Sequence, residues 1–388
     1  MTDRLPSADW TQRPDLAALV AALGGGNARY VGGAVRDTLL GVGVRDVDLA
    51  TPLPPPAVMA RLDAAGIRHV PTGLDHGTVT AVLANGPVEI TTLRRDVATD
   101  GRRATVAFAT EWHEDAARRD FTINALYADP VSGELFDYFG GLADLAKRRV
   151  RFIGDARQRI HEDHLRILRY FRFQARFGSQ PPDTEAENSC AELAATLKGL
   201  SRERIGMEFC NLLGLPDPAP TVARMEELGV LAVIMPEADP QALARLVAGE
   251  LRQDVAPDPI RRLAALLPPD VPLAEQVAAR FRLSGAQKKR LATAAARPAA
   301  AEKPRALAYR LGREQALDRL LLAGADIGAL AGWDIPVFPL KGGAIVARGV
   351  KAGPEVARIL QTVEKRWVAE NFPDAARVQK LLDETLAP

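Results

Sequence analysis

The spacing of apolar residues changes along the chain, and that change divides it into two regions. Over the first 150 residues, apolar and polar positions alternate in short runs, which predicts strands at residues 28–31, 78–83, 88–92 and 135–139. Apolar spacings of three and four predict helices at residues 15–23, 35–40 and 56–65. After about residue 155, stretches rich in Ala, Leu, Arg and Glu predict helices, separated by proline clusters. We therefore expect an α/β head followed by an all-helical remainder.

A glycine pair joins the first predicted strand to the helix after it. Gly32 and Gly33 let backbone amides approach a ligand closely, and the helix start offers free N–H groups. Arg36 lies about one turn into the helix, where it could reach a phosphate. The arrangement suits a triphosphate, although a glycine pair before a helix is as often an ordinary turn.

Two carboxylates follow the glycine turn within about ten residues. Asp46 and Asp48 lie two apart, so on a strand both would project from the same face. Adjacent carboxylates repel unless a cation lies between them, and such hard oxygen ligands suit Mg²⁺. Glu89 is a candidate third ligand, and the alternative is a strand residue that points to solvent.

A second polar cluster occupies residues 118–126. Arg119 could reach a phosphate, while Asp120 and Asn124 could bind a ribose or each other. The alternative is a helix start with Asp120 as its N-cap, but that does not explain the paired arginines before it.

Residues 157–176 predict one amphipathic helix with six arginines and only two acids. Asp163, Arg166, Arg169 and Arg172 recur every three residues along it. A carboxylate only accepts hydrogen bonds and a guanidinium only donates them. Cytosine and adenine both carry an amino group beside a ring-nitrogen acceptor, whereas uracil and guanine carry the reverse. Asp163 with Arg166 would therefore select C and A, at a cost of roughly 1–3 kcal/mol for each mismatched group.

Composition restricts the class of protein without naming a partner. The 388 residues are enough for two to four domains, and the net charge of +1 argues against general coating of nucleic acid. The chain has no apolar run of membrane-spanning length and no secretory pattern at its start. Two cysteines, Cys190 and Cys210, in no metal-ligand spacing, favour a reducing cytoplasm.

The ordered motifs resemble those of the class II CCA-adding enzymes, over about residues 28–215. They are Gly32-Gly-Ala-Val-Arg-Asp37 with Asp46-Val-Asp48, Arg118-Arg-Asp-Phe-Thr-Ile-Asn124, and Glu162-Asp-His-Leu-Arg166-Ile-Leu-Arg169. That family includes bacterial poly(A) polymerases and belongs to the DNA-polymerase-β-like nucleotidyltransferases. The resemblance implies a mixed-sheet head at residues 1–150, a neck with the nucleotide-recognition helix at 151–215, a body at 216–300 and a tRNA-binding tail at 301–388.

The same resemblance implies a role for each motif residue. Asp46 and Asp48 would hold the ions of a two-metal Mg²⁺ site, and Gly33, Arg36 and Arg119 would contact the nucleotide. Asp163 and Arg166 would serve as an amino-acid template for CTP and ATP, with Arg169 and Arg172 supporting the base and triphosphate. Residues 137–141 look like the hinge between head and neck. Residues 94–114, which include Thr99-Asp-Gly-Arg-Arg103, look like the flexible loop required for the final A.

Three alternatives to CCA addition to tRNA remain. A poly(A) polymerase would need a site that rejects CTP, which the Asp163–Arg166 pair does not provide. An enzyme adding only A or only CC would keep the same core, although the full-length loop favours complete addition. A catalytically inactive RNA-binding protein would have no need of Asp46, Asp48, Asp163 and Arg166 together.

Overall fold

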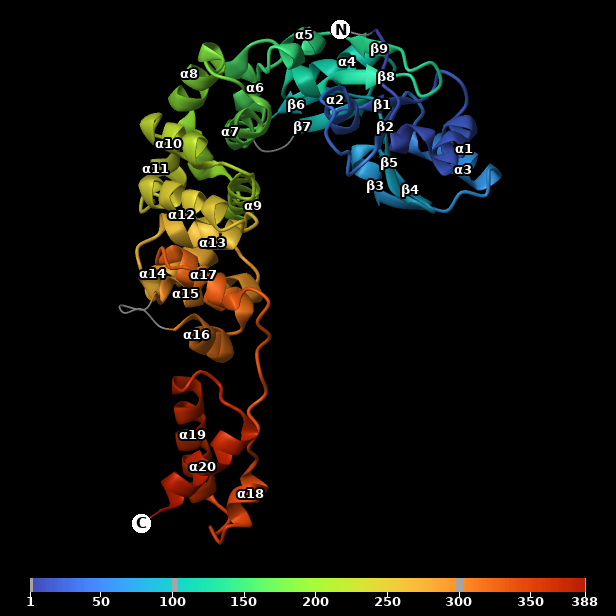
Figure 1. Cartoon of the computed structure of the whole chain (residues 1–388). Helices are drawn as coiled ribbons and strands as arrows, with labels where there is room; N and C mark the ends of the chain where they lie inside the picture. The colour runs from blue at the N-terminus through green and yellow to red at the C-terminus, as the bar shows by residue number, and fades with distance from the viewer. Residues whose placement is uncertain (1–2, 100–103, 298–302, 388) are drawn as a thin grey trace. The chain divides into compact units, whose positions relative to one another are not determined.

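The computed structural model describes residues 3–99, 104–297 and 303–387, which form two compact units, residues 1–236 and 237–388 (Figure 1). The first unit contains a seven-stranded mixed sheet and a set of helices, and the second unit is helical. The expected α/β head and helical remainder are therefore confirmed. In the described part of the chain, the helices are all too short or too polar to cross a membrane.

The head sheet runs in the order β3-β4-β5-β2-β1-β8-β9. Its strands are β1 (Arg29–Val31), β2 (Asp48–Thr51), β3 (His69–Gly73), β4 (Thr78–Leu83), β5 (Gly86–Thr92), β8 (Leu126–Ala128) and β9 (Leu135–Asp137). Strands β2 and β5 pair in parallel, and the other pairs are antiparallel. The parallel register sets Asp48 opposite Glu89, which brings two motifs forty residues apart to one edge of the site.

Helices of the head are α1 (Pro14–Leu23), α2 (Gly33–Leu39), α3 (Pro55–Ala64), α4 (Trp112–Ala117) and α5 (Gly141–Ala146). All three helices expected before residue 70 form within two residues of the expected bounds. Helix α2 contacts β1 and β8, so the start of this helix lies beside the middle of the sheet. The buried side chains Val31, Ala50 and Tyr127 of the sheet pack in one core cluster with Ala116 and Trp112 of α4.

Strand prediction succeeded where apolar and polar residues alternate and failed where they do not. The expected strand at 78–83 has the bounds of β4. Strand β8 was missed because all three of its residues are buried, which removes the alternation. Strand β3 was missed because it is a mostly exposed edge strand that contains Pro71.

Residues 94–114, expected as a flexible loop, include regular secondary structure. A two-stranded hairpin, β6 (Arg94–Thr99) and β7 (Ala104–Phe108), leads into α4. Residues 100–103, part of the Thr99–Arg103 run, lie outside the described residues.

The single helix expected at 157–176 is wrong. The chain forms α6 (Ala156–Glu162) and α7 (Arg166–Phe177), with a break at residues 163–165. Asp163 is extended at φ −150° and ψ 106°, and its Oδ1 accepts a hydrogen bond from the Leu165 amide at 3.1 Å. A short carboxylate that bonds to nearby backbone competes with the helix, which explains the break.

The remaining α-helices of the described chain lie on both sides of the boundary between the two units. Those of the first unit are α8 (Thr184–Glu192), α9 (Arg202–Leu213), α10 (Ala219–Glu227) and α11 (Val230–Ile234). The second unit begins with α12 (Pro240–Arg252) and α13 (Pro259–Leu266). It continues with α14 (Val271–Arg280), α15 (Gly285–Ala295), α16 (Pro304–Leu311), α17 (Arg313–Leu322), α18 (Gly342–Val346), α19 (Pro354–Ala369) and α20 (Ala375–Leu386).

The segment expected as a hinge is tightly held where it enters α5. The strand expected to reach Phe139 ends at Asp137, whose carboxylate accepts hydrogen bonds from the amides of Phe139, Gly141 and Leu142. A Cβ atom added at Gly141 would lie 2.2 Å from the Thr122 carbonyl oxygen, so this position requires glycine.

We predict that Gly141→Ala destabilises the first unit. Backbone must move to admit the methyl group, which costs roughly 1–3 kcal/mol in the free energy of unfolding measured in urea. The matched control is Gly25→Ala, because a Cβ there meets nothing within 4 Å. Equal stability of the two variants would contradict the close approach of Gly141 to the Thr122 carbonyl.

Candidate functional site

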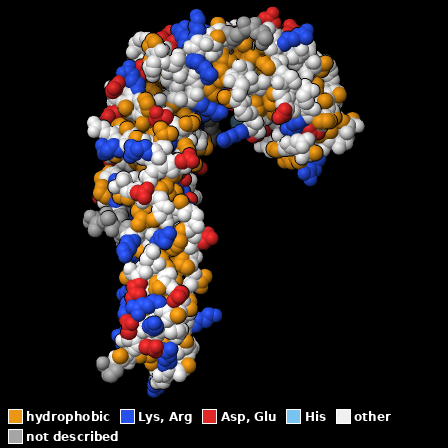
Figure 2. Space-filling view, viewed as in Figure 1, with side chains coloured by type: hydrophobic (Ala, Val, Ile, Leu, Met, Phe, Trp, Pro, Cys, Tyr) orange, Lys and Arg blue, Asp and Glu red, His pale blue; other side chains and the backbone are white. Residues whose placement is uncertain are grey.

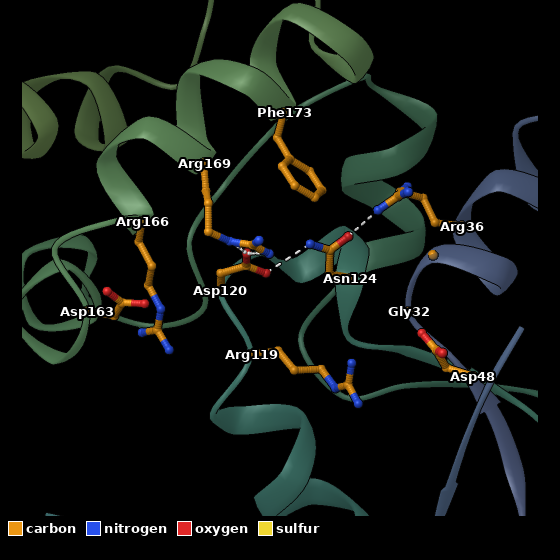
Figure 3. Close-up of a pocket in the computed structure, with 11 residues that line it drawn as sticks. Gly32, Arg36, Asp48, Arg119, Asp120, Asn124, Asp163, Arg166, Arg169 and Phe173 are labelled. Carbon is orange, nitrogen blue, oxygen red and sulfur yellow. Dashed lines mark hydrogen bonds and ion pairs between the residues drawn. The ribbon is translucent and has the colours of Figure 1, made fainter. Parts of the chain in front are cut away.

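A cavity of about 390 Å³ opens between the glycine turn, the 119–124 segment and the start of α7 (Figure 3). Asp163 and Arg166 lie at one end of it, Gly32 and Asp48 at the other, and Asp120 and Asn124 between them. The lining residues are Gly32, Gly33, Arg36, Asp48, Arg119, Asp120, Asn124, Asp163, Arg166, Arg169 and Phe173. The structure thus collects almost all of the predicted nucleotide-binding residues around one cavity.

At the Asp48 end, negative charge is concentrated. Burial and the neighbouring carboxylates of Glu89 and Asp46 raise the pKa of Asp48 to about 6, against the opposing effect of Arg119. A carboxylate whose ionisation is disfavoured in this way is stabilised by a cation. The donor set therefore fits a hard divalent ion that completes its coordination with phosphate oxygens and water.

The three predicted metal ligands do not form one compact cluster. Strand β2 begins at Asp48, so the condition under which both aspartates would share one strand face is not met, and Asp46 lies exposed in the preceding loop. Glu89 is exposed as well, although it pairs in register with Asp48. Within the described residues there is no group of three or more His, Cys, Asp or Glu side chains close enough to hold a metal on their own. Asp48 is the only one of the three that lines the cavity.

The glycine turn places backbone beside two polar groups of the site. Gly32 has φ 66°, and a Cβ there would lie 3.4 Å from Nη1 of Arg119. Arg36 is 5% exposed and is held by Asp37, with Nε 2.8 Å from Oδ1. Its guanidinium also lies 4.1 Å from the centroid of the Phe177 ring. Arg36 therefore lines the cavity as a fixed cation and not as a mobile arm.

The centre of the site is a chain of side chains that runs from α2 to α7. Arg36 donates to Oδ1 of Asn124, and Nδ2 of Asn124 donates to Oδ1 of Asp120 at 2.9 Å. Nε and Nη2 of Arg169 donate to Oδ2 of Asp120 at 2.8 and 2.5 Å. Burial alone would raise the pKa of Asp120, but Arg169 and Asn124 outweigh it and lower the pKa to about 2. Asp120 and Asn124 bind each other, as one sequence expectation held, while the N-cap alternative is not observed.

Arg119 is oriented by a residue that the sequence reading missed. Asp115, 2% exposed on α4, accepts from Nη2 of Arg119 at 3.0 Å and from the Tyr127 hydroxyl at 2.7 Å. Its other oxygen accepts from the Arg94 amide at 3.2 Å, where the hairpin β6–β7 begins. An acid four residues before an arginine was the available signal, because such pairs lie on neighbouring turns of a helix.

At the opposite end, Asp163 and Arg166 keep unused hydrogen-bonding positions. Nη1 of Arg166 donates to the Arg159 carbonyl at 2.9 Å and to Glu162 at 2.6 Å. Nη2 donates once, to the Arg118 carbonyl at 3.0 Å. In the described parts of the chain, the second Nη2 hydrogen and the Nε hydrogen have no partner. Arg166 therefore retains donors for an acceptor in the cavity.

Comparison with known proteins identifies the family. A mitochondrial CCA tRNA nucleotidyltransferase 1 of Mus musculus is 37% identical over 365 residues, which cover 89% of this chain and 83% of the relative. The chain belongs to the CCA tRNA nucleotidyltransferase family. Its residues 28–151 match the poly A polymerase head domain, and residues 182–241 match a family described as a probable RNA and SrmB-binding site of polymerase A.

Solved structures of the family share the fold over nearly the whole chain. The Bacillus stearothermophilus CCA-adding enzyme, in complex with CTP, has a TM-score of 0.76 and 27% identity, and the match covers 96% of this chain and 98% of that one. The Thermotoga maritima enzyme, complexed with tRNA, has a TM-score of 0.69 at 20% identity and covers 93% and 90%. The head is thus that of a polymerase-β-like nucleotidyltransferase.

The arginines of residues 157–176 are not an unpaired basic surface in this family member. Each of the six forms an ion pair, mostly with an acid from another element. The pairs are Arg157–Glu192, Arg159–Glu162, Arg166–Glu162, Arg169–Asp120, Arg172–Glu208 and Arg176–Asp37. Counting charges within one segment could not reveal acids that only the fold supplies.

Two members of α7 lie differently from expectation. Arg172, predicted to bind nucleotide, is not among the residues that line the cavity; its Nε lies 2.5 Å from Oε1 of the buried Glu208 on α9. Phe173 was not predicted and lines the cavity instead. Its ring centroid lies 4.9 Å from the Arg172 guanidinium carbon and 5.5 Å from that of Arg169. The geometry of α7 explains the difference. Residues three apart turn steadily around a helix, so Arg172 lies about 120° from Arg166, whereas Phe173, seven residues on, lies within about 20° of it.

We predict that Asp120→Asn lowers the free energy of unfolding by about 2–3 kcal/mol at pH 7. This is below the 3–5 kcal/mol of fully buried pairs because a third of the Arg169 side chain is exposed. Folding lowers the pKa of Asp120 from 3.8 to about 2, so the carboxylate stabilises the fold above about pH 4. That contribution disappears as the pH falls through about 2.

Urea unfolding of the wild type and Asp120→Asn between pH 7 and pH 2.5 measures this difference. The gap between the two proteins should narrow only below about pH 4. A gap that stays constant with pH, or one absent at pH 7, would show that Asp120 does not carry the charge assigned to it.

Proposed function

We propose that this chain adds and repairs the 3′-terminal CCA of tRNA, from CTP and ATP, without a nucleic-acid template and with release of pyrophosphate. The observation that carries the proposal is the pairing of an acceptor, Asp163, with donors of Arg166 at one end of a single cavity. Cytosine and adenine satisfy both groups. Uracil and guanine would instead place a carbonyl acceptor against the Asp163 carboxylate and a ring N–H donor against Arg166.

The nucleotide would span the cavity from end to end. Its base lies against Asp163 and Arg166, and its triphosphate extends toward the glycine turn and Asp48. Arg119 is the cation nearest that turn, and its hydrogen bond to Asp115 fixes its direction. Arg169, tied to Asp120, supplies positive charge beside the base end. This orientation of the nucleotide is supported by Figure 3, in which Asp163 and Arg166 lie at one end of the cavity and Gly32 and Asp48 at the other.

Asp48, with Asp46 and Glu89 beside it, is the proposed holder of Mg²⁺. When bound, a two-metal Mg²⁺ site makes the tRNA 3′-hydroxyl more acidic and neutralises charge on the phosphates. The protein contributes the carboxylates; burial, together with repulsion from Glu89 and Asp46, raises the pKa of Asp48. It also orients the nucleotide, because the arginines of the cavity and the carboxylates of Asp120 and Asp163 are held by hydrogen bonds to neighbouring groups.

The helical second unit and the neck helices are the proposed support for the tRNA. Figure 2 shows Lys and Arg side chains interspersed with Asp and Glu over the visible face, in keeping with the net charge of +1. Contacts to phosphate and sugar at scattered cations position a duplex without reading its sequence. The domain bounds 151–215, 216–300 and 301–388 remain predictions.

The cytoplasm is the proposed compartment. Both cysteines, Cys190 and Cys210, are free thiols, as a reducing environment favours. The mouse relative is named as a mitochondrial protein. Cell fractionation with compartment markers tests the assignment, and recovery of the chain with an organelle would overturn it.

Of the rival activities, a poly(A) polymerase is the nearest. The head family carries that name, but both base-reading residues here accept C as well as A. The wild-type chain, Mg²⁺ and a tRNA that ends at its discriminator base should gain C, C and A in order when CTP and ATP are supplied. Long A tails from ATP alone would support the polymerase instead.

We predict that Asp48→Asn lowers the rate of nucleotide addition by about a hundredfold to a thousandfold. The change keeps the shape of the side chain but removes the charge that holds the metal, and chelation by EDTA should abolish wild-type activity until Mg²⁺ is restored. Asp63→Asn is the matched control, since that carboxylate is largely exposed on α3. An Asp48→Asn protein as active as the control would refute the metal assignment.

We also predict that Asp163→Asn relaxes the choice of base. An amide offers a donor as well as an acceptor, so the ratio of kcat/KM for CTP to that for UTP should fall by roughly tenfold or more. Glu192→Gln, which weakens a surface ion pair of the same unit, is the control. An unchanged ratio would mean that Asp163 does not read the base.

A further inference from the structure

The carboxylate of Asp163 is held by an arginine from another helix. Nη2 of Arg204, in the first turn of α9, lies 2.7 Å from Oδ2 and 3.0 Å from Oδ1 of Asp163. The side chains of Arg204 and Asp163 are 35% and 28% exposed, so neither is fully buried. Arg204 does not line the cavity itself.

Counting hydrogen-bonding positions shows what this contact leaves open. A carboxylate accepts about four hydrogen bonds, two on each oxygen. Oδ1 accepts from the Leu165 amide at 3.1 Å and from Arg204, and Oδ2 accepts from Arg204. One position on Oδ2 therefore remains, which matches the single amino group that cytosine or adenine would present.

Helix α9, which carries Arg204, is held against α7 by further contacts. Glu208 lies four residues later on the same face of α9 and binds Arg172 of α7 at 2.5 Å. Between them, Ile205 is buried in the contact of α9 with α7. The break residue Asp163 and the helix α7 are thus each joined to α9 by an ion pair.

We propose that Arg204 is a specificity-determining positioning residue, which holds the Asp163 carboxylate in place so that uracil and guanine are rejected. The inference rests on the proposed function, because it assumes that Asp163 reads the base. Rejection depends on a carbonyl of the wrong base meeting a carboxylate oxygen. That encounter is costly only if the carboxylate cannot rotate away or admit a water molecule. The ion pair with Arg204 keeps the Asp163 carboxylate from rotating away.

The test compares kcat/KM for CTP and for UTP in the first addition to tRNA that lacks CCA, with the full-length chain. Arg204→Met replaces the aliphatic part of the arginine side chain with one of similar length but donates no hydrogen bond. We expect the ratio of kcat/KM for CTP to that for UTP to fall about tenfold or more. Arg204→Lys should keep the ratio within about threefold of wild type, because one nitrogen, Nη2, makes both contacts and an ammonium can take its place. Arg157→Met, which breaks the exposed pair with Glu192, is the matched control and should leave the ratio unchanged.

The ratio is measured within one preparation, so it does not depend on how much of the protein is active. If Arg204 acts through Asp163, adding Arg204→Met to Asp163→Asn should lower the ratio no further than the single Asp163→Asn change. Should Arg204→Met not fold, as judged by circular dichroism, Arg204→Leu provides the same readout, because leucine also donates no hydrogen bond.

Equal losses of kcat/KM for CTP and UTP in Arg204→Met would overturn the proposal and leave Arg204 a purely structural residue. An Arg204→Lys variant as unselective as Arg204→Met would also overturn it. Failure of the wild-type chain to add C to the tRNA is a different result, since it would refute the proposed function itself.

Discussion

The buried carboxylate of Asp120 joins the α/β head to helix α7, and the geometry of the site depends on that junction. One oxygen accepts from Asn124, which in turn holds Arg36 of α2, and the other accepts from Arg169 of α7. A buried carboxylate left without these partners would be costly, so the loss of any one of them weakens the junction between the head and the helix. The four linked side chains, those of Arg36, Asn124, Asp120 and Arg169, all line the cavity.

The same principle governs the other charges of the site. Arg119 is held by Asp115, Arg166 by Glu162, and Asp163 by Arg204. A fixed cation or carboxylate costs little reorganisation when substrate arrives, and it cannot adapt to the wrong substrate. Selection between bases that differ only in the order of donor and acceptor requires that rigidity.

How much of this could be predicted from the sequence depended on whether the signal was local. The glycine turn, the Asp48 carboxylate and the Arg119–Asn124 cluster were predicted because each is a short motif whose chemistry its own residues reveal. The break at Asp163 was not, because the helical spacing of apolar residues continues through it. The roles of Arg204 and Glu208 were missed for another reason: each binds a partner that only the fold brings near, as Arg172 also shows.

The structure of the full chain with bound CTP tests the central claim most directly. The account predicts the cytosine amino nitrogen within hydrogen-bonding distance of Oδ2 of Asp163 and the ring nitrogen N3 within reach of a donor of Arg166. Arg204 should still contact Asp163, and the triphosphate should extend toward Gly32 and Asp48. A base that lies away from Asp163, or one that displaces Arg204 from it, would contradict the account.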